Sequence, residues 1–424
     1  MRAHKNSGIQ PVNHWQQEAL FYTAIGMVVS IVVSRASLSV TSILFVLLAT
    51  VHKHFFSQLK RFAATPYLLL FSLLFFIPLV SGLWSENMKQ WADIIRIKLP
   101  LLFLPVAAAA GNWVFNDKKW KTLALVFLAI IFGSCVWSLA HYLQDTMAMH
   151  EAYLRAKTIP TPLENDHVRF SWLVSIAAAL CTLLIRMCRQ PRLQYVLGFL
   201  LIFFAVYLHI LSARTGLISL YLIILIYGGW LLKQAASKKR VIVAVLLFLA
   251  MPIVAYFLLP TFKARVHYNL YDLSFVKKTE YLPGSSDGAR VMSIKAGWQV
   301  LMQNPLGVGA GDIRTEANKW YEANVPAVLP SDQFYPSSEW LMYGGFAGWP
   351  GAVLFTIIMT AAFIYRPKYF GVFWIALHAT AAFSFAFDMG LEVQYGVFLY
   401  AFLTVWWWKW FNAPNDPGHL SAEA

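Results

Sequence analysis

The hydrophobic positions of this 424-residue chain gather in long runs instead of alternating with polar positions. A helix needs about 20 mostly apolar residues to cross roughly 30 Å of hydrocarbon at about 1.5 Å per residue. Runs that approach this length are predicted to be twelve membrane-spanning helices, at residues 19–33, 37–52, 66–84, 99–114, 122–143, 168–187, 194–212, 215–232, 241–260, 339–364, 370–386 and 394–410. The first two runs are short, so a re-entrant pair is an alternative there.

The composition agrees with a polytopic membrane protein. Hydrophobic residues make up 59% of the chain and charged residues 13%, against about 45–50% and about 25% in soluble domains. The mean hydropathy of +0.57 excludes a disordered chain and a soluble domain with one anchor. The three cysteines lie in or beside apolar runs, so no disulfide framework is indicated. The predicted fold class is therefore all-α.

The positive charges predict an orientation. The chain has 34 Lys and Arg against 20 Asp and Glu, and alternate short connections such as 118–121 and 233–240 are basic. Because basic loops stay on the cytoplasmic side, both termini are predicted to be cytoplasmic. The long connection between the ninth and tenth spans then faces outward. The predicted divisions are helices 1–9 in 1–260, a loop domain in 261–338, helices 10–12 in 339–412 and a cytoplasmic tail in 413–424.

The long loop is predicted to be partly helical, because a structureless connection of this length is unusual. A helix-like run extends from Ala289 to Gln303, and a second covers Ile313 to Tyr321. The glycine-rich segment 304–311 separates them. This segment lacks the Lys-Ser/Thr of a phosphate-binding loop and follows a helix-like run instead of a strand. It predicts a tight turn with close backbone packing.

Several positive charges lie on the predicted outer side, against the orientation rule, so each needs a reason. Arg214 sits in a short turn between two spans. Its guanidinium fork suits a lipid phosphate or diphosphate, and the alternative is contact with ordinary headgroups. Arg96, Lys98, Arg169 and Arg35 could ring one external cavity together with Arg214. The alternative is that they anchor the protein at the membrane interface, which is favoured for Arg35 and Lys98. In the long loop, Arg265 lies close after the ninth span and Arg290 lies upstream of the glycines.

Arg290 could instead pair with Asp287 or Glu280. Acidic side chains near the outer boundary are few, and Glu339 and Glu392 are candidate bases or orienting groups. Each could equally be a salt-bridge partner for an arginine, which is favoured for Glu392. No metal-binding signature is present in the sequence. If diphosphate chemistry occurs, arginines must neutralise the leaving group.

These motifs together resemble the bacterial O-antigen ligase and polymerase family. Ser212-Ala-Arg-Thr-Gly216 resembles the Ser-Arg-Thr-Gly element of that family. Arg290, Gly297-Trp298 and Asn304-Pro-Leu-Gly-Val-Gly309 look like its loop signature. Pro336-Ser-Ser-Glu-Trp-Leu341, followed by Gly345 and Gly348, looks like the segment that re-enters the membrane. The resemblance covers residues 212 to 350.

The resemblance implies an inner-membrane glycosyltransferase that needs no metal and no cofactor. A glycan on undecaprenyl diphosphate would pass, with inversion, to a sugar hydroxyl of lipid A-core or another acceptor on the periplasmic face. The implied partners are this donor, the acceptor and membrane lipids, with no nucleic acid. Arg214 and Arg290 would hold the diphosphate. Further candidates for substrate binding are Arg265, Arg169, Arg96, His167, Ser337 and Ser338.

The sequence departs from the family at one position. The family places His and then Asn directly after the proline, whereas this chain has Ser337-Ser338. Glu339 could take the role of base, because its pKa would rise in a low-dielectric cleft. Alternatively His167 or His267 fills the space, or the acceptor differs. We take Glu339 as the candidate base, beside Arg214 and Arg290. A polymerase that extends one lipid-linked glycan with another is an alternative function, and a lipid-linked glycan transporter is an alternative of another class.

Overall fold

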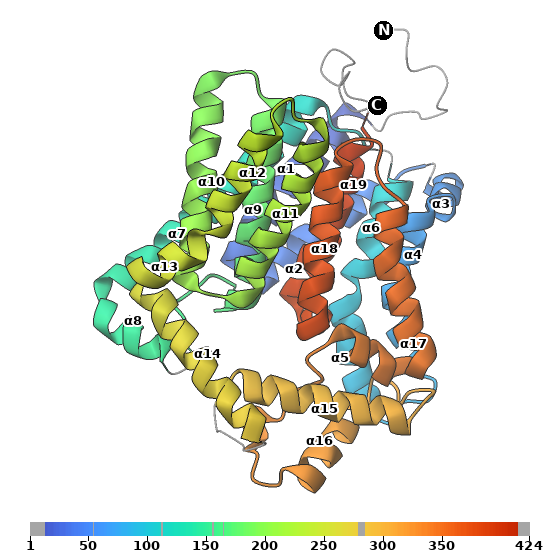
Figure 1. The fold of residues 1–424 in the computed structure, drawn as a ribbon. Coiled ribbons are helices and arrows are strands. Elements are labelled where there is room, and N and C mark those ends of the chain that lie inside the picture. Colours follow the sequence, from blue (N-terminus) through green and yellow to red (C-terminus); the bar gives the residue numbers. More distant parts are fainter. Residues whose placement is uncertain are drawn as a thin grey trace.

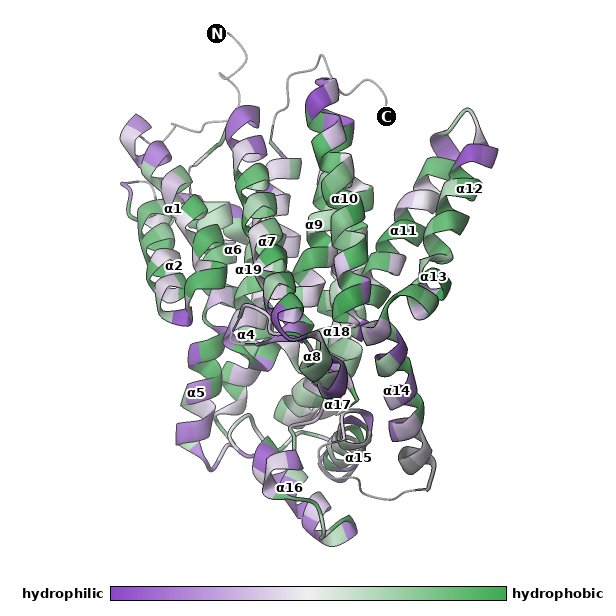
Figure 2. Ribbon diagram, turned by 90° about the vertical axis from the view of Figure 1, so that its left-hand side faces the viewer, coloured by the Kyte–Doolittle hydropathy of each residue, from purple (hydrophilic) through white to green (hydrophobic). Residues whose placement is uncertain are grey.

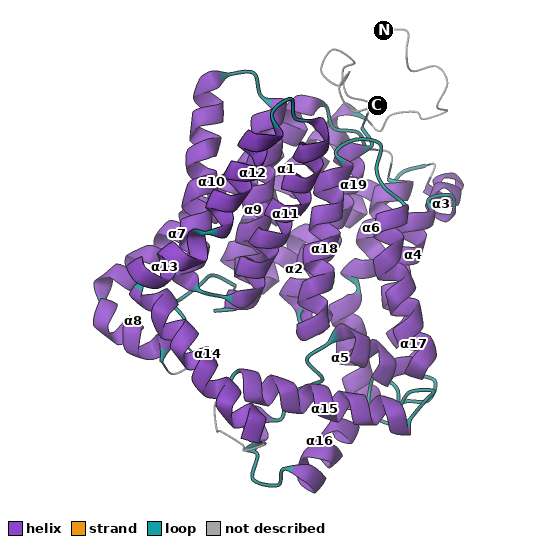
Figure 3. Ribbon diagram, viewed as in Figure 1, coloured by secondary structure: helices purple, strands orange, loops and turns teal. Residues whose placement is uncertain are grey.

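The computed structural model describes residues 13–53, 55–111, 113–154, 157–163, 165–278 and 285–413. Within these ranges the regular structure is entirely helical, with no strand (Figure 3). The first helices are α1 (His14–Val33), α2 (Arg35–Thr50), α3 (Phe55–Ala63), α4 (Pro66–Ser81), α5 (Met88–Lys98), α6 (Pro100–Ala110), α7 (Asp117–Gln144) and α8 (Thr146–Tyr153). Next come α9 (His167–Met187), α10 (Pro191–Leu211), α11 (Arg214–Gln234), α12 (Lys238–Leu249), α13 (Met251–Leu258), α14 (Pro260–Lys278), α15 (Asp287–Gln303) and α16 (Ile313–Asn324). The chain ends with η1 (Pro330–Asp332), α17 (Glu339–Ile364), α18 (Gly371–Phe387), η2 (Gly390–Glu392) and α19 (Gln394–Phe411).

Each predicted apolar run falls on one helix, except 241–260, which is divided between α12 and α13. Seven helices of the described chain are long and apolar enough to cross a membrane: His14–Val33, Asp117–Gln144, His167–Met187, Pro191–Leu211, Arg214–Gln234, Lys238–Leu258 and Glu339–Ile364. The apolar helices α2, α4 and α18 are shorter. The protein is thus an all-helical, multi-pass membrane protein, while the count of twelve spans stays a prediction.

Helix α9 lies inside the bundle, where it packs against α7, α10, α11 and α18. Most of its side chains are buried, as expected for a helix that is apolar on every side. Helices α12 and α13, which follow one another along a single candidate span, lie at the edge with almost no buried side chains. Figure 2 shows hydrophobic residues along the middle of the bundle and hydrophilic residues at its two ends. This distribution is typical of a bundle that spans a bilayer.

Helices α14, α15 and α16 lie at one end of the bundle, and the start of α1 and the end of α19 lie at the other (Figure 1). Helix α15 covers the helix-like run from Ala289, and α16 covers the run from Ile313. Which end faces the cytoplasm stays a prediction. Of the predicted tail, only Ala413 is among the described residues.

The glycine-rich segment after α15 packs on the backbone of α17. The sequence predicts this close packing but not the partner. Gly307 and Gly348 have φ of +85° and +66°, and a Cβ on Gly348 would overlap the Pro305 carbonyl group. The Trp349 N–H donates to the Pro305 carbonyl at 2.9 Å. Helix α17 is kinked at this point, because Gly348 is not helical. The segment therefore fixes the loop helices to α17 through backbone contacts.

Candidate functional site

Arg214 is positioned by the turn between α10 and α11. Ser212 adopts a left-handed conformation with φ +54° and ends α10, and its hydroxyl donates to the His209 carbonyl at 2.6 Å. A Cβ on Gly216 would come within 2.5 Å of the Ser171 Cβ, so glycine lets α11 approach α9. Arg214 is consequently held at the first residue of α11.

The guanidinium of Arg214 faces the start of α15. Its Nη1 lies 2.5 Å from Asp287 Oδ1, and its Nη2 lies 3.5 Å from the Ser286 hydroxyl. The Arg214 side chain is 36% exposed. A cation at a helix N-terminus is unfavourable with respect to the helix dipole, and Asp287 offsets this cost. The fork thus remains open to solvent on one side.

Asp272 of α14 orders the first turn of α15. It is fully buried, and its carboxylate accepts hydrogen bonds from the backbone N–H groups of Ser286, Asp287 and Gly288 at 3.1, 2.7 and 3.3 Å. This contact is equivalent to an N-cap supplied by another helix. Arg290 follows Gly288 by two residues, on the part of α15 that this contact orders. No pattern in the sequence pointed to Asp272.

Arg265 of α14 is 5% exposed. Its Nε and Nη1 atoms are buried and have no hydrogen-bond partner in the described structure. The guanidinium lies 5.6 Å from the ring centroid of Tyr268. Burial lowers the pKa of Arg265, and nearby Arg214 lowers it further, yet an arginine remains charged. A buried cation with unsatisfied donors points to an anionic ligand.

Arg169 of α9 is a further arginine near Arg290, contributed by the helix bundle. It lies 2.6 Å from Asp388 and 3.4 Å from Asp166, and it donates to the Met389 carbonyl at 3.2 Å. Burial raises the pKa of Asp388, while Arg169 and Arg290 oppose the rise.

Arg290 interacts electrostatically with Asp388, Arg214, Asp287 and Arg169, and burial lowers its pKa. Glu280, the other partner expected from the sequence, lies outside the described residues. Four helices, α9, α11, α14 and α15, therefore bring four arginines together. We call Arg169, Arg214, Arg265 and Arg290 the arginine cluster.

Ser337 and Ser338 lie at the start of α17, and both are buried. The hydroxyl groups of Ser337 and Ser293 are 2.8 Å apart, and the Ser337 N–H donates to Ser293 Oγ at 3.2 Å. Close packing of α15 supports this contact, because a Cβ on Gly297 would lie 2.5 Å from the Pro336 Cβ. Ser337 thus joins α15 to α17.

Glu339 is completely buried. Its Oε1 accepts from the Leu391 N–H at 2.5 Å, and its Oε2 has no partner in the described structure. Lys98, also buried, donates to the Leu391 carbonyl at 2.9 Å and to Glu392 Oε1 at 2.5 Å. Glu392 therefore pairs with a lysine and not with an arginine. Glu339 also interacts electrostatically with Arg169, which connects Glu339 to the arginine cluster.

The two candidate histidines, His167 and His267, lie in different places. His167, at the first residue of α9, interacts electrostatically with Arg265, Asp166 and Arg169. His267 lies 3.2 Å from the Tyr256 hydroxyl at an exposed position. Only His167 of these two thus lies among the arginines.

Arg96 is exposed and lies 3.3 Å from Asp93 within α5. It lines a separate groove. The structure thus does not bring it to the arginine cluster. Asp388, a pairing partner of Arg169, is a residue that the sequence analysis did not select.

The model of the family described as O-antigen ligase matches residues 198–356 of the chain. This range runs from α10 into α17 and contains three members of the arginine cluster, while Arg169 precedes it. The match confirms the resemblance drawn from the motifs. No curated protein matches the sequence.

Proposed function

The chain belongs to the O-antigen ligase family through the domain at residues 198–356, and we propose that it transfers a glycan from undecaprenyl diphosphate to a sugar hydroxyl of lipid A-core. Membrane glycosyl transfer of the ligase or polymerase type follows from the family. The donor, the acceptor and the mechanism are our proposal. The observation that carries it is the arginine cluster, in which Arg265 is buried with two unsatisfied nitrogens.

The arginine cluster binds the diphosphate in this mechanism. Arg214 offers a partly exposed fork, Arg265 offers a buried charge, and Arg290 offers a half-buried one. Arginine suits this task because its planar donors match two phosphate oxygens at once. Charge placed where the leaving group develops its negative charge lowers the barrier. Arg169 is committed to Asp388 and acts as a positioning residue.

The acceptor hydroxyl attacks the anomeric carbon from the side opposite the diphosphate. The new C–O bond forms as the bond from the anomeric carbon to the phosphate oxygen breaks, and the diphosphate keeps the electron pair. Inversion of the anomeric centre follows. The hydroxyl proton passes to a base, and we assign this role to His167, which interacts electrostatically with Arg265 and Arg169 of the arginine cluster.

Glu339, the base favoured by the sequence, takes a supporting role in this proposal. It has no exposed surface, so it touches an incoming hydroxyl only if the packing at the start of α17 changes. Its hydrogen bond to Leu391 positions the segment that carries Asp388. Ser337 keeps the start of α17 attached to α15 through Ser293.

The proposal includes the location of the protein in the cell. We propose the bacterial inner membrane, with both termini in the cytoplasm and the arginine cluster facing the periplasm. The basic connections at the end of the bundle opposite α14–α16 support this orientation. A polymerase would use the same group-transfer chemistry with a second polyprenyl diphosphate as acceptor, and a transporter would move the glycan without breaking a bond.

The test is a transfer assay with purified protein, undecaprenyl diphosphate glycan and lipid A-core, run in EDTA. Wild type is expected to form product, and Arg265→Ala is expected to lose it. Lys319→Ala is the matched control, since Lys319 is exposed and pairs with Glu316 on α16. Lengthening of the lipid-linked glycan without transfer to lipid A-core would establish a polymerase. Intact donor in every reaction would refute the proposal.

A further inference from the structure

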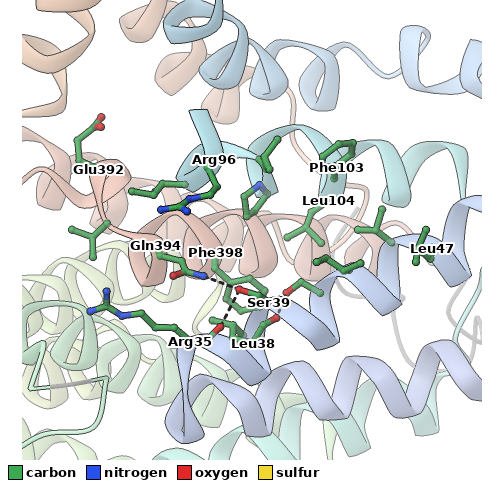
Figure 4. Close-up of a pocket in the computed structure, with 17 residues that line it drawn as sticks. Arg35, Leu38, Ser39, Leu47, Arg96, Phe103, Leu104, Glu392, Gln394 and Phe398 are labelled. Atoms are coloured by element: carbon green, nitrogen blue, oxygen red, sulfur yellow. Dashed lines mark hydrogen bonds between the residues drawn. The ribbon is translucent and has the colours of Figure 1, made fainter. Parts of the chain in front are cut away.

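A groove large enough for a lipid lies away from the arginine cluster. Helices α2, α6 and α19 enclose a groove of about 1010 Å³, with the end of α5 and η2 at its mouth (Figure 4). The Gln394 amide donates to the Ser39 hydroxyl at 2.8 Å and ties α19 to α2. This hydrogen bond therefore joins two walls of the groove.

The groove is polar at one end and apolar along its length. Figure 4 shows Arg35, Arg96 and Gln394 toward one end and Leu47 at the other. Arg35 and Leu47 are twelve residues apart on α2, or roughly 18 Å at about 1.5 Å per residue. This depth is close to half of a hydrocarbon core of about 30 Å. The groove thus matches one leaflet, with its cations where a lipid headgroup lies.

We propose that this groove holds the acyl chains of the acceptor lipid, with a phosphate of its headgroup at Arg35 and Arg96. The inference rests on the proposed function, because transfer between two lipids requires two lipid sites. The diphosphate of the donor is assigned to α11, α14 and α15, which contribute nothing to the walls of the groove.

Charge complementarity supports a phosphorylated lipid. The cations of the groove lie on the side of α14–α16, where positive charge runs against the orientation rule. Arg35 lies 5.3 Å from the ring centroid of Tyr395. Arg96 pairs with Asp93 at an exposed position, and such pairs contribute little. A phosphate can therefore replace Asp93 as the partner of Arg96.

A buried polar path connects the groove to the arginine cluster. Glu392 lines the groove and is neutralised by Lys98. Lys98 binds the carbonyl of Leu391, whose N–H binds Glu339. Glu339 in turn interacts with Arg169. An acceptor seated in the groove thus lies against the elements that position the arginine cluster.

The first experiment uses lipid A with a diazirine in one acyl chain, added to the full-length protein in phosphatidylcholine nanodiscs. Irradiation is expected to label peptides of α2 or α19. Excess unlabelled lipid A-core is expected to reduce the label, and excess phosphatidylglycerol or undecaprenyl diphosphate is not. Label confined to other helices, or equal competition by either of those two lipids, would overturn the inference.

The second experiment fills the groove by Ser42→Trp. The expected result is a rise of about tenfold in KM for lipid A-core, with KM for the donor unchanged. Val40→Trp is the matched control, because Val40 lies on the same helix, is exposed and does not line the groove. Equal acceptor KM in both variants would overturn the inference and leave the proposed function intact. If wild type transfers nothing, the proposed function fails, and the labelling of wild type still decides the groove.

Discussion

Replacing Arg214 by lysine keeps the positive charge and removes the planar fork. Arg214 lies 2.5 Å from Asp287 and 3.5 Å from the Ser286 hydroxyl. Lysine can retain an ion pair with Asp287. It cannot present two parallel donors to a diphosphate. The change therefore separates the fork geometry from the charge.

The structure predicts different magnitudes for folding and for activity. The Arg214 side chain is 36% exposed, so solvent screening limits its ion pair to about 1 kcal/mol at most. We expect normal insertion and an unchanged thermal unfolding temperature. One charged hydrogen bond lost from the transition state costs about 1.5–3 kcal/mol, which slows transfer by about tenfold to about 150-fold.

The assay measures initial rates of glycan transfer at saturating donor, with Arg366→Lys as the control. Arg366 is exposed and donates to the Phe363 carbonyl at the far end of α17. This control makes the same chemical change outside the site and is expected to keep the wild-type rate. Full activity of Arg214→Lys would remove Arg214 from diphosphate binding and refute the reasoning.

Three further changes test the parts that support the site. Glu339→Gln keeps the shape of the side chain and is expected to lower kcat by up to about a hundredfold with donor binding retained; unchanged turnover would remove Glu339 from the site. Asp272→Asn weakens the cap of α15 by about 1 kcal/mol, and we expect faster hydrogen exchange at 285–290 with a higher donor KM; wild-type exchange there would contradict the cap. Gly348→Ala is expected to destabilise the protein by at least about 2 kcal/mol, because φ at this position is +66°. Gly133→Ala on α7 is the control, since open space surrounds Gly133, and it should be neutral or stabilising in thermal unfolding. Equal stability of these two variants would disprove the role of Gly348.

The sequence by itself determined the fold class and the ordering of the helices. Apolar runs near 20 residues require helices in a bilayer, because every backbone N–H and C=O must be paired within the segment. Local chemistry also determined the turn at Ser212-Ala-Arg-Thr-Gly216 and the close backbone packing of the segment 304–311. The family motifs within 212–350 followed from the same local patterns, and the family match agrees with them.

Only the tertiary structure decided which charged groups meet. Arg169 and Asp388 are 2.6 Å apart although 219 positions separate them, and the sequence pattern within each helix does not encode that contact. Packing buried Glu339 completely and paired Glu392 with Lys98, which a list of boundary charges could not reveal. The same holds for the groove, whose walls come from α2, α6 and α19. Helices form from local hydrogen bonds and apolar length, whereas ion pairs and grooves depend on how the helices pack together.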